Sequence, residues 1–287
     1  MDLIPGLPND IALDCLIRVP YNHFSSAASV CRSWKYEIEL PSFRHHRKYA
    51  GLSRRIAVMV QSPADSNWKH GLRKYSAAPA YSLTVYEPET GNWSKLPPVP
   101  GFSDGLPLFC QIVPVGFNLV VMGGLNPENW DASRFLYVYS FVSAMWRRGL
   151  DMPGCRRSFF GCASDNDRRI FVAGGHDTEK NALRSGMMYD VAEDNWTVLP
   201  DMADERDECK DGAVVALDHS SRTRIPSDMN SVSCVIECGG QLLAVGSDGF
   251  GGSRGVYVLD VERSTWVKAE MPEEYSGHIQ SGCCLEV

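Results

Sequence analysis

Residues 170–196, IFVAGGHDTEKNALRSGMMYDVAEDNW, contain the pattern from which the fold can be predicted. A short apolar run ends at Gly174-Gly175, a second run contains Tyr189, and Trp196 follows after a polar turn. Short apolar runs separated by Gly, Asn and Asp are typical of β-strands joined by tight turns. Paired glycines accept positive φ and close backbone contact, and a large Trp can fill the space between packed sheets. The stretch therefore predicts three successive strands.

The same order recurs along the chain. Residues 118–146 repeat it one period of roughly 50 residues earlier, within the range of propeller blades. Less regular copies occupy residues 56–93, without the glycines, and 242–266, where Gly-Ser replaces Gly-Gly. The interval from Trp196 to Trp266 is longer than the others, and within it only residues 213–217 form a plausible strand. Four ordered units predict an all-β repeat domain in which one blade is degenerate or incomplete.

This order resembles the kelch repeat over most of residues 55–287. The resemblance implies a β-propeller with units near residues 55–98, 107–150, 156–200 and 231–271, and an irregular segment at residues 207–230. Residues 277–287 are expected to supply the first strand of the unit that begins at Arg55. Such a closing strand would join the two ends of the domain in one blade and remove an exposed sheet edge.

The first 48 residues have a different, helical pattern. Asn9 is expected to cap a first helix, which Pro20 ends because proline disfavours helix in the residue before it. Apolar residues from His23 to Trp34 predict a second helix, and Pro41 is expected to stop a third piece. Three short helices bury too little surface to be stable alone. Either a foreign partner or the rest of the same chain must cover them, and both alternatives stand.

The motifs of this segment resemble an F-box: a Leu-Pro opening, a Val-Pro after the first helix and a Val-Cys-Arg-x-Trp signature, in that order. The resemblance implies that the segment docks a Skp-type adaptor of a cullin-RING ubiquitin ligase. The residues that would line or support that interface are Leu7, Pro8, Ile11, Leu16, Ile17, Val19, Pro20, Val30, Cys31 and Trp34. Trp34 is expected to be the hot spot, because buried Trp anchors typically cost about 2 kcal/mol or more when truncated. The chain is thus predicted to be an α+β multidomain protein, with a small all-α F-box over residues 1–48 and an all-β kelch propeller over residues 49–287.

Composition limits the partners and the compartment. The 287 residues are 44% hydrophobic and carry a formal net charge of −7, with an isoelectric point near 5.5. No clustered basic run is present, so nucleic acid is not an expected partner. No stretch approaches the ~20 apolar residues of a membrane span, and no basic leader precedes an apolar core. We expect a protein of the cytoplasm, the nucleus or both, with its ten cysteines as reduced thiols.

The loops before the first strands of the units are the candidate binding positions of the propeller. By resemblance to kelch ligand-binding domains, Arg157 and Arg206 are expected to contact a target protein, with Asp207 and Glu208 beside them. The alternative is that these are solvated loop charges, each worth a few tenths of a kcal/mol. Seven histidines do not cluster, and the glycine-rich residues 246–255 lack the Lys-Ser/Thr ending of a phosphate loop. No catalytic residue, metal or cofactor is therefore predicted.

Overall, the chain resembles the plant Kelch-domain F-box proteins that include the KISS ME DEADLY group. The resemblance implies a substrate-recognition subunit of an SCF-type (Skp-cullin-F-box) ubiquitin ligase, which acts by raising the effective concentration of a target and is not itself an enzyme. Targets reported for that group are phenylalanine ammonia-lyase, which implies phenylpropanoid control, and type-B response regulators, which implies cytokinin signalling. Two alternatives stay open: a metal-dependent enzyme built on a kelch propeller, and a scaffold that does not lead to degradation.

Overall fold

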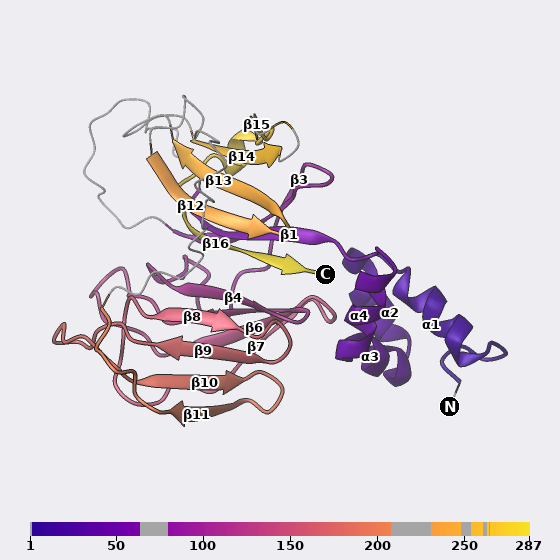
Figure 1. The fold of residues 1–287 in the computed structure, drawn as a ribbon, viewed down its shortest axis with the longest axis horizontal. Helices are drawn as coiled ribbons and strands as arrows, with labels where there is room; N and C mark the ends of the chain where they lie inside the picture. The colour runs from indigo at the N-terminus through magenta and orange to yellow at the C-terminus, as the bar shows by residue number, and fades with distance from the viewer. Residues whose placement is uncertain (1, 64–79, 208–230, 248–253, 261–262, 264) are drawn as a thin grey trace.

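Four short helices form one end of the molecule, at the right of Figure 1. The computed structural model describes residues 2–63, 80–207, 231–247, 254–260, 263 and 265–287. The helices are α1 (Asn9–Ile17), α2 (Phe24–Val30), α3 (Arg32–Glu39) and α4 (Pro41–Tyr49), with a 3-10 turn η1 (Tyr21–His23) after the first. The third helix ends before Pro41, as expected, but the expectation of only three helical pieces was wrong. Pro41 begins α4, because the first turn of a helix needs no backbone N–H from that residue.

Two helix ends also differ from the prediction. Pro8, not Asn9, precedes the first helical residue of α1, and the Asn9 Oδ1 accepts the backbone N–H of Leu3 at 3.0 Å. The predicted helix from His23 to Trp34 is broken at Cys31, whose backbone is extended. The Cys31 Sγ accepts the N–H of Trp34 at 3.4 Å and so caps α3. A side chain that satisfies a free N–H in this way favours a new helix start over a continued helix.

The rest of the described chain forms four antiparallel sheets of four strands. In chain order, the second sheet contains β4 (Gln111–Val115), β5 (Asn118–Met122), β6 (Leu136–Ser140) and β7 (Met145–Arg148). The third sheet contains β8 (Gly161–Ser164), β9 (Arg169–Ala173), β10 (Gly186–Asp190) and β11 (Asn195–Leu199). The fourth sheet contains β12 (Ser231–Cys238), β13 (Gln241–Ser247), β14 (Arg254–Asp260) and β15 (Thr265–Lys268), and a 3-10 turn η3 (Glu273–Tyr275) follows it.

The remaining sheet, here called the closing sheet, joins the first and last strands of the propeller. Its strand order is β16 (Ile279–Glu286), β1 (Arg55–Gln61), β2 (Ser82–Glu87), β3 (Asn92–Lys95). β16 pairs with β1 in antiparallel register from Arg55 opposite Glu286 onward, and Arg54 and Val287 exchange two backbone hydrogen bonds beyond it. The prediction that the last segment completes the unit starting at Arg55 is confirmed.

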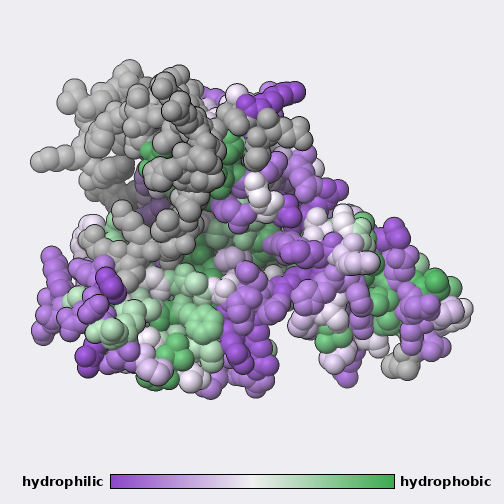
Figure 2. Space-filling view, in the orientation of Figure 1, coloured by the Kyte–Doolittle hydropathy of each residue, from purple (hydrophilic) through white to green (hydrophobic). Residues whose placement is uncertain are grey.

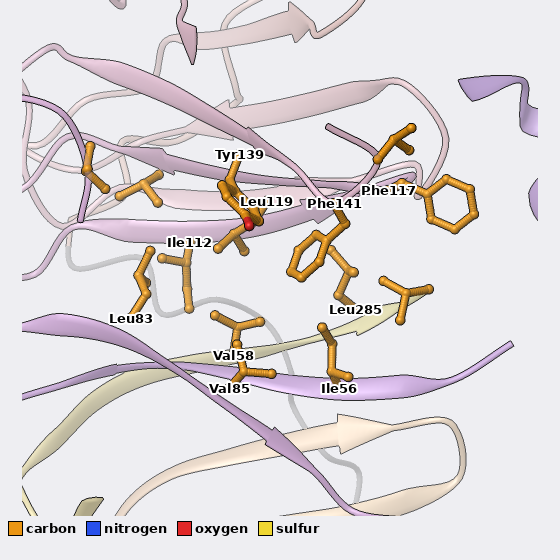
Figure 3. Close-up of a cluster of buried hydrophobic side chains, with 14 of the residues drawn as sticks. Ile56, Val58, Leu83, Val85, Ile112, Phe117, Leu119, Tyr139, Phe141 and Leu285 are labelled. Carbon is orange, nitrogen blue, oxygen red and sulfur yellow. The ribbon is translucent and has the colours of Figure 1, made fainter. Parts of the chain in front are cut away.

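The faces of β5 show how the sheets pack. Alternate residues of a strand point to opposite faces. Leu119 and Val121 belong to the hydrophobic cluster that includes Val58 and Val85 of the closing sheet, as Figure 3 shows for most of these side chains. Val120 and Met122, on the other face of β5, belong to the cluster that includes Ile170 and Val172 of the third sheet. Both faces of the second sheet are therefore buried, as a central blade requires.

Tryptophan indoles link consecutive sheets. The Nε1–H groups of Trp146, Trp196 and Trp93 donate at 2.9 Å to the carbonyl oxygens of Pro97, Leu150 and Glu270, respectively. Each acceptor lies four residues after the tryptophan of the adjoining sheet. These bonds give the sheet order as fourth, closing, second and third. Trp266 differs: its Nε1 is buried and has no hydrogen-bond partner within the described chain.

Among the described residues, the third sheet lacks the cover that the second sheet has. Phe171 occupies the position in β9 that Val120 occupies in β5, but Phe171 is 38% exposed and Val120 is fully buried. Together with the unpaired indole of Trp266, this exposure shows that, within the described part of the chain, the regular packing of one sheet on the next does not continue from the third sheet to the fourth. The predicted strand at residues 213–217 lies outside the described residues.

One expectation about the cysteines was wrong. Cys238 of β12 and Cys284 of β16 are joined by a disulfide, although all ten cysteines were expected to be reduced. The first strands of the fourth and closing sheets lie next to one another, which brings the two Cα atoms within 5.2 Å, a separation that a disulfide can span. Sequence spacing could not indicate the pair, since 46 residues separate its members.

Candidate functional site

One side of the helical domain packs against the propeller through an aromatic cluster. Phe24 of α2 and Phe43 of α4 contact Phe117, which lies in the turn between β4 and β5, with ring centroids 5.3 and 6.4 Å apart. All three rings are buried. The Tyr21 hydroxyl donates a hydrogen bond to the Glu87 carboxylate. The pKa of Tyr21 is raised, mainly by burial and to a smaller extent by this hydrogen bond. This side of the helices is thus covered by the same chain.

Arg47 ties the helices together beneath that cluster. Its guanidinium donates to the carbonyl oxygens of Ile17, Val19 and Leu52, and its Cζ lies 4.9 Å from the centre of the Phe24 ring. Burial lowers the pKa of Arg47 to about 10, so the group keeps its proton at neutral pH. Because α1 ends at Ile17, these bonds hold the end of α1 against α4.

The other side of the helical domain is exposed and partly apolar. Leu7, Ile11 and Val30 are 37, 48 and 62% exposed. Cys15, which is also exposed, lies four residues after Ile11 and so on the same face of α1. Figure 2 shows hydrophobic residues in green at this outer end of the helices. We call this set of four residues the outer helical surface.

The predicted adaptor-binding residues divide between the two sides of the domain. Leu7, Pro8, Ile11, Pro20, Val30 and Cys31 are exposed, Val19 and Trp34 are half-buried, and Leu16 and Ile17 are buried. Trp34 donates its Nε1–H to the Leu3 carbonyl oxygen at 2.6 Å, which holds the segment before α1 in place. Sequence reasoning missed Cys15 and the exposed Tyr36, which lines a shallow pocket with Leu3 and Leu13. The spacing of Cys15 from Ile11 was the available signal.

The loops at the opposite end of the propeller contain the other predicted site. Arg157 is only 2% exposed and donates to the carbonyl oxygens of Gly174 and Ser185 and to the Ser185 hydroxyl, so it braces the loop between β9 and β10. Arg206 is exposed and lies 3.6 Å from Asp204. Asp207 is exposed as well, and Glu208 lies outside the described residues.

His176 joins Asp207 at this end, a contact that the sequence did not indicate. The His176 Nδ1 lies 2.6 Å from the Asp207 Oδ1, and the imidazole packs against the Phe159 ring with centroids 5.3 Å apart. Leu183 pairs with Arg206 in a short β-bridge. This pairing helps to bring His176 and Asp207, which are 31 positions apart in the sequence, side by side. Such loop pairing has no periodic signature in the sequence.

Neither a metal cluster nor a membrane helix appears in the part of the chain that the structure describes. No three His, Cys, Asp or Glu side chains there are grouped closely enough to hold a metal ion. No helix among those residues is long and apolar enough to span a bilayer.

Comparison with known families agrees with both halves of the structure. The F-box domain model matches residues 4–46, and the Kelch motif model matches residues 156–203. The F-box/kelch-repeat protein At1g80440 of Arabidopsis thaliana is 38% identical, over all of this chain and all of the relative. The chain belongs to the F-box/kelch-repeat proteins. A second Arabidopsis F-box/kelch-repeat protein, At1g15670, is 37% identical, also over the whole of both chains.

The alignment of this F-box/kelch-repeat protein with its relative contains gaps. The alignment with At1g80440 spans 360 positions against the 287 residues here, a difference of 73. A third Arabidopsis relative, F-box/kelch-repeat protein At2g44130, is 36% identical over 74% of this chain and 56% of its own length. The 73 positions exceed one repeat period of roughly 50 residues.

Proposed function

We propose that this protein is the substrate-recognition subunit of an SCF-type ubiquitin ligase. The F-box binds a Skp-type adaptor, and through it a cullin-RING ligase, while the kelch propeller binds a target protein for ubiquitination and proteasomal degradation. The observation that carries the proposal is the outer helical surface, since Leu7, Ile11 and Val30 are apolar and exposed. Helix α1, which contains Ile11, lies farthest from the propeller in Figure 1. The chain holds the target close to the ligase and does not itself catalyse the transfer of ubiquitin.

The geometry is consistent with a helical domain that binds the adaptor and a propeller that binds the target. The turn that contains Phe117 touches the helices, whereas the loops around Arg206 lie at the opposite end of the strands. The aromatic cluster and the ion pairs Arg44–Asp167 and Lys48–Glu286 join the helices to the sheets. A target bound at the far loops would thus be held in one orientation relative to the adaptor.

The test is to place charges on the outer helical surface. In a variant with Ile11→Glu and Val30→Glu, we expect affinity for a purified Skp-type adaptor to fall at least 100-fold, about 2.7 kcal/mol, because two carboxylates would be buried at the interface. Both side chains are exposed in the free protein, so the midpoint of thermal unfolding should stay unchanged. Isothermal calorimetry measures the affinity, and adaptor binding equal to that of the natural chain would disprove the assigned surface.

Tyr49→Glu is the matched control. Tyr49 is 96% exposed at the end of α4, outside the outer helical surface, so the same kind of charge there should leave adaptor binding intact. Cysteine alkylation gives an independent readout. Cys15 and Cys31 in the helical domain and Cys155 in a distant loop are all exposed. The adaptor should protect the first two from iodoacetamide and leave Cys155 reactive.

The resemblance to the KISS ME DEADLY group suggests phenylalanine ammonia-lyase and type-B response regulators as targets, and we place the protein in the cytoplasm, the nucleus or both. Affinity capture from plant cells treated with a proteasome inhibitor would decide between the two targets. We expect one of them to be enriched and its half-life to lengthen in cells that lack the protein. Enrichment without a change in half-life would instead favour a scaffold that does not lead to degradation.

A further inference from the structure

Aromatic residues, of which Phe109 and Trp130 are exposed and Phe159 is half-buried, lie at the end of the propeller away from the helices. Phe109 and Phe159 each stand two residues before the first strand of a sheet, β4 and β8, and their φ angles are 58° and 54°. Trp130, 61% exposed in the loop between β5 and β6, has φ 61°. Bulky residues rarely adopt this left-handed conformation, and it persists where the surrounding structure holds it, often at binding sites.

Two of these rings form a row with His176. The ring centroids of Phe109 and Phe159 are 5.1 Å apart, and those of Phe159 and His176 are 5.3 Å apart. The row is fixed at both ends. The Phe109 N–H donates to Gln280 Oε1 of the closing sheet at 2.8 Å, and His176 bonds to Asp207. We call Phe109, Phe159 and His176 the aromatic row; it crosses from the second sheet to the third, and Phe109 is 40% exposed.

The loops around the aromatic row carry an excess of acidic residues. Residues 100–110, 123–135, 149–160, 174–185 and 200–207 make up these loops in the second and third sheets. Their ten carboxylates are Asp104, Glu128, Asp131, Asp151, Asp177, Glu179, Asp201, Asp204, Glu205 and Asp207. Their six basic side chains are Arg134, Arg156, Arg157, Lys180, Arg184 and Arg206. Figure 2 shows hydrophilic residues over the loops at the left edge of the molecule.

Most of the basic groups are directed at the chain itself. Arg134 donates to the Gly154 carbonyl oxygen at 3.2 Å, and Arg156 donates to the Ala132 carbonyl oxygen at 2.9 Å. Arg157 is buried, and Arg184 pairs with Asp201 at 3.0 Å. Asp204 and Glu205, which precede the Asp207 that bonds to His176, are exposed, and Asp204 lies 3.6 Å from Arg206. The described loops of the second and third sheets therefore carry more acidic than basic side chains.

We propose that the aromatic row and its surrounding carboxylates bind an extended segment of the target protein that contains lysine or arginine. This inference rests on the proposed function, in which the propeller holds a target. A cationic side chain is attracted to the face of an aromatic ring, and its aliphatic stem packs on the ring. Carboxylates beside the rings attract the same segment and repel acidic ones.

The experiment compares two fluorescent peptides, one of alternating lysine and serine and one of alternating glutamate and serine, on the full chain. We expect fluorescence anisotropy to detect binding of the lysine peptide only, with an affinity that falls as salt is raised. Phe109→Ala should weaken that binding about fivefold, whereas Phe109→Tyr should preserve it. Val198→Ala, at an exposed apolar residue of β11 outside the row, is the matched control and should have no effect.

A second variant guards against a folding defect. Asp204→Lys with Glu205→Lys changes only exposed side chains, and it should weaken the lysine peptide about tenfold at low salt. Failure of the lysine peptide to bind, tighter binding of the glutamate peptide, or indifference to both variants would overturn the inference. Adaptor affinity is measured on the same samples. Its loss would count against the proposed function, whereas intact adaptor affinity with no peptide effect counts against the aromatic row alone.

Discussion

The indole nitrogens decide how firmly one sheet is tied to the next. Three of them donate to a backbone carbonyl of the adjoining sheet, whereas the buried Nε1 of Trp266 has no partner in the described chain. A typical intramolecular hydrogen bond stabilises the fold by about 1 kcal/mol, and a buried unpaired donor costs a similar amount or more. The same substitution should therefore have different effects at the two kinds of position.

We predict that Trp146→Phe lowers the free energy of unfolding by about 1 to 2 kcal/mol more than Trp266→Phe does. Both changes remove the same atoms, but only the first removes a hydrogen bond, the one to the Pro97 carbonyl oxygen. Urea denaturation of the two variants measures the difference. Equal losses would mean that the indole of Trp266 has found a partner that the structure does not show.

Single residues also show what sequence can and cannot reveal. Gly123 was expected to need positive φ and close contact, and it has φ 65° with a Cβ position only 2.8 Å from the Phe160 ring. Repetition of the glycines along the chain made that inference possible. Arg157 gave no such signal, because its burial depends on Gly174 and Ser185, which are close only after the strands pair. Its sequence position alone favoured an exposed role.

At the scale of elements, the turn between β4 and β5 joins the helices to the propeller. We predict that Phe117→Ala destabilises this junction by about 3 kcal/mol or more, because it leaves a cavity between Phe24 and Phe43. Limited proteolysis should then cut faster between α4 and β1. Adaptor affinity should not change, since the outer helical surface is on the other side of the helices.

Phe171→Ala is the control for that variant. Phe171 is a phenylalanine in β9 that is 38% exposed, so its removal should cost much less and should leave the cleavage rate between α4 and β1 unchanged. A Phe117→Ala protein with unaltered proteolysis would show that the polar contacts alone, such as Arg44 with Asp167, hold the two domains together.

Elements were predicted best where a local pattern repeats. The units that contain Trp93, Trp146, Trp196 and Trp266 all form sheets, because each carries its own strands and turns in sequence. The helices were harder to divide. The start of α4 at Pro41 and the break at Cys31 depend on one proline and one side-chain cap, and an apolar stripe continues across such features without change.

At the scale of the whole molecule, one covalent bond links the fourth sheet to the closing sheet. We predict that reducing the Cys238–Cys284 disulfide lowers the free energy of unfolding by up to about 4 kcal/mol, the loop-entropy value for its 46-residue separation. Urea denaturation with and without dithiothreitol measures the loss. In a Cys238→Ser, Cys284→Ser variant the reductant should have no effect, and an equally stable reduced natural chain would contradict the prediction.

The repeats in the sequence predicted the number of sheets, but they did not predict whether each sheet packs on the next. The long interval between Trp196 and Trp266 pointed to the right place, and the exposure of Phe171 and the unpaired Trp266 locate the interruption there. The disulfide and the His176–Asp207 contact join residues far apart in the chain, so no local pattern could announce them.

The pairing of β16 with β1 sets an order of events during synthesis. β1 leaves the ribosome more than 200 residues before the strand that completes its sheet. Until β16 has been translated, the edge of β1 that contains Ile56 and Val58 has no partner strand. The helices that precede β1 have by then already left the exit tunnel. A nascent chain can therefore present its amino-terminal helices to a partner before the domain behind them has closed.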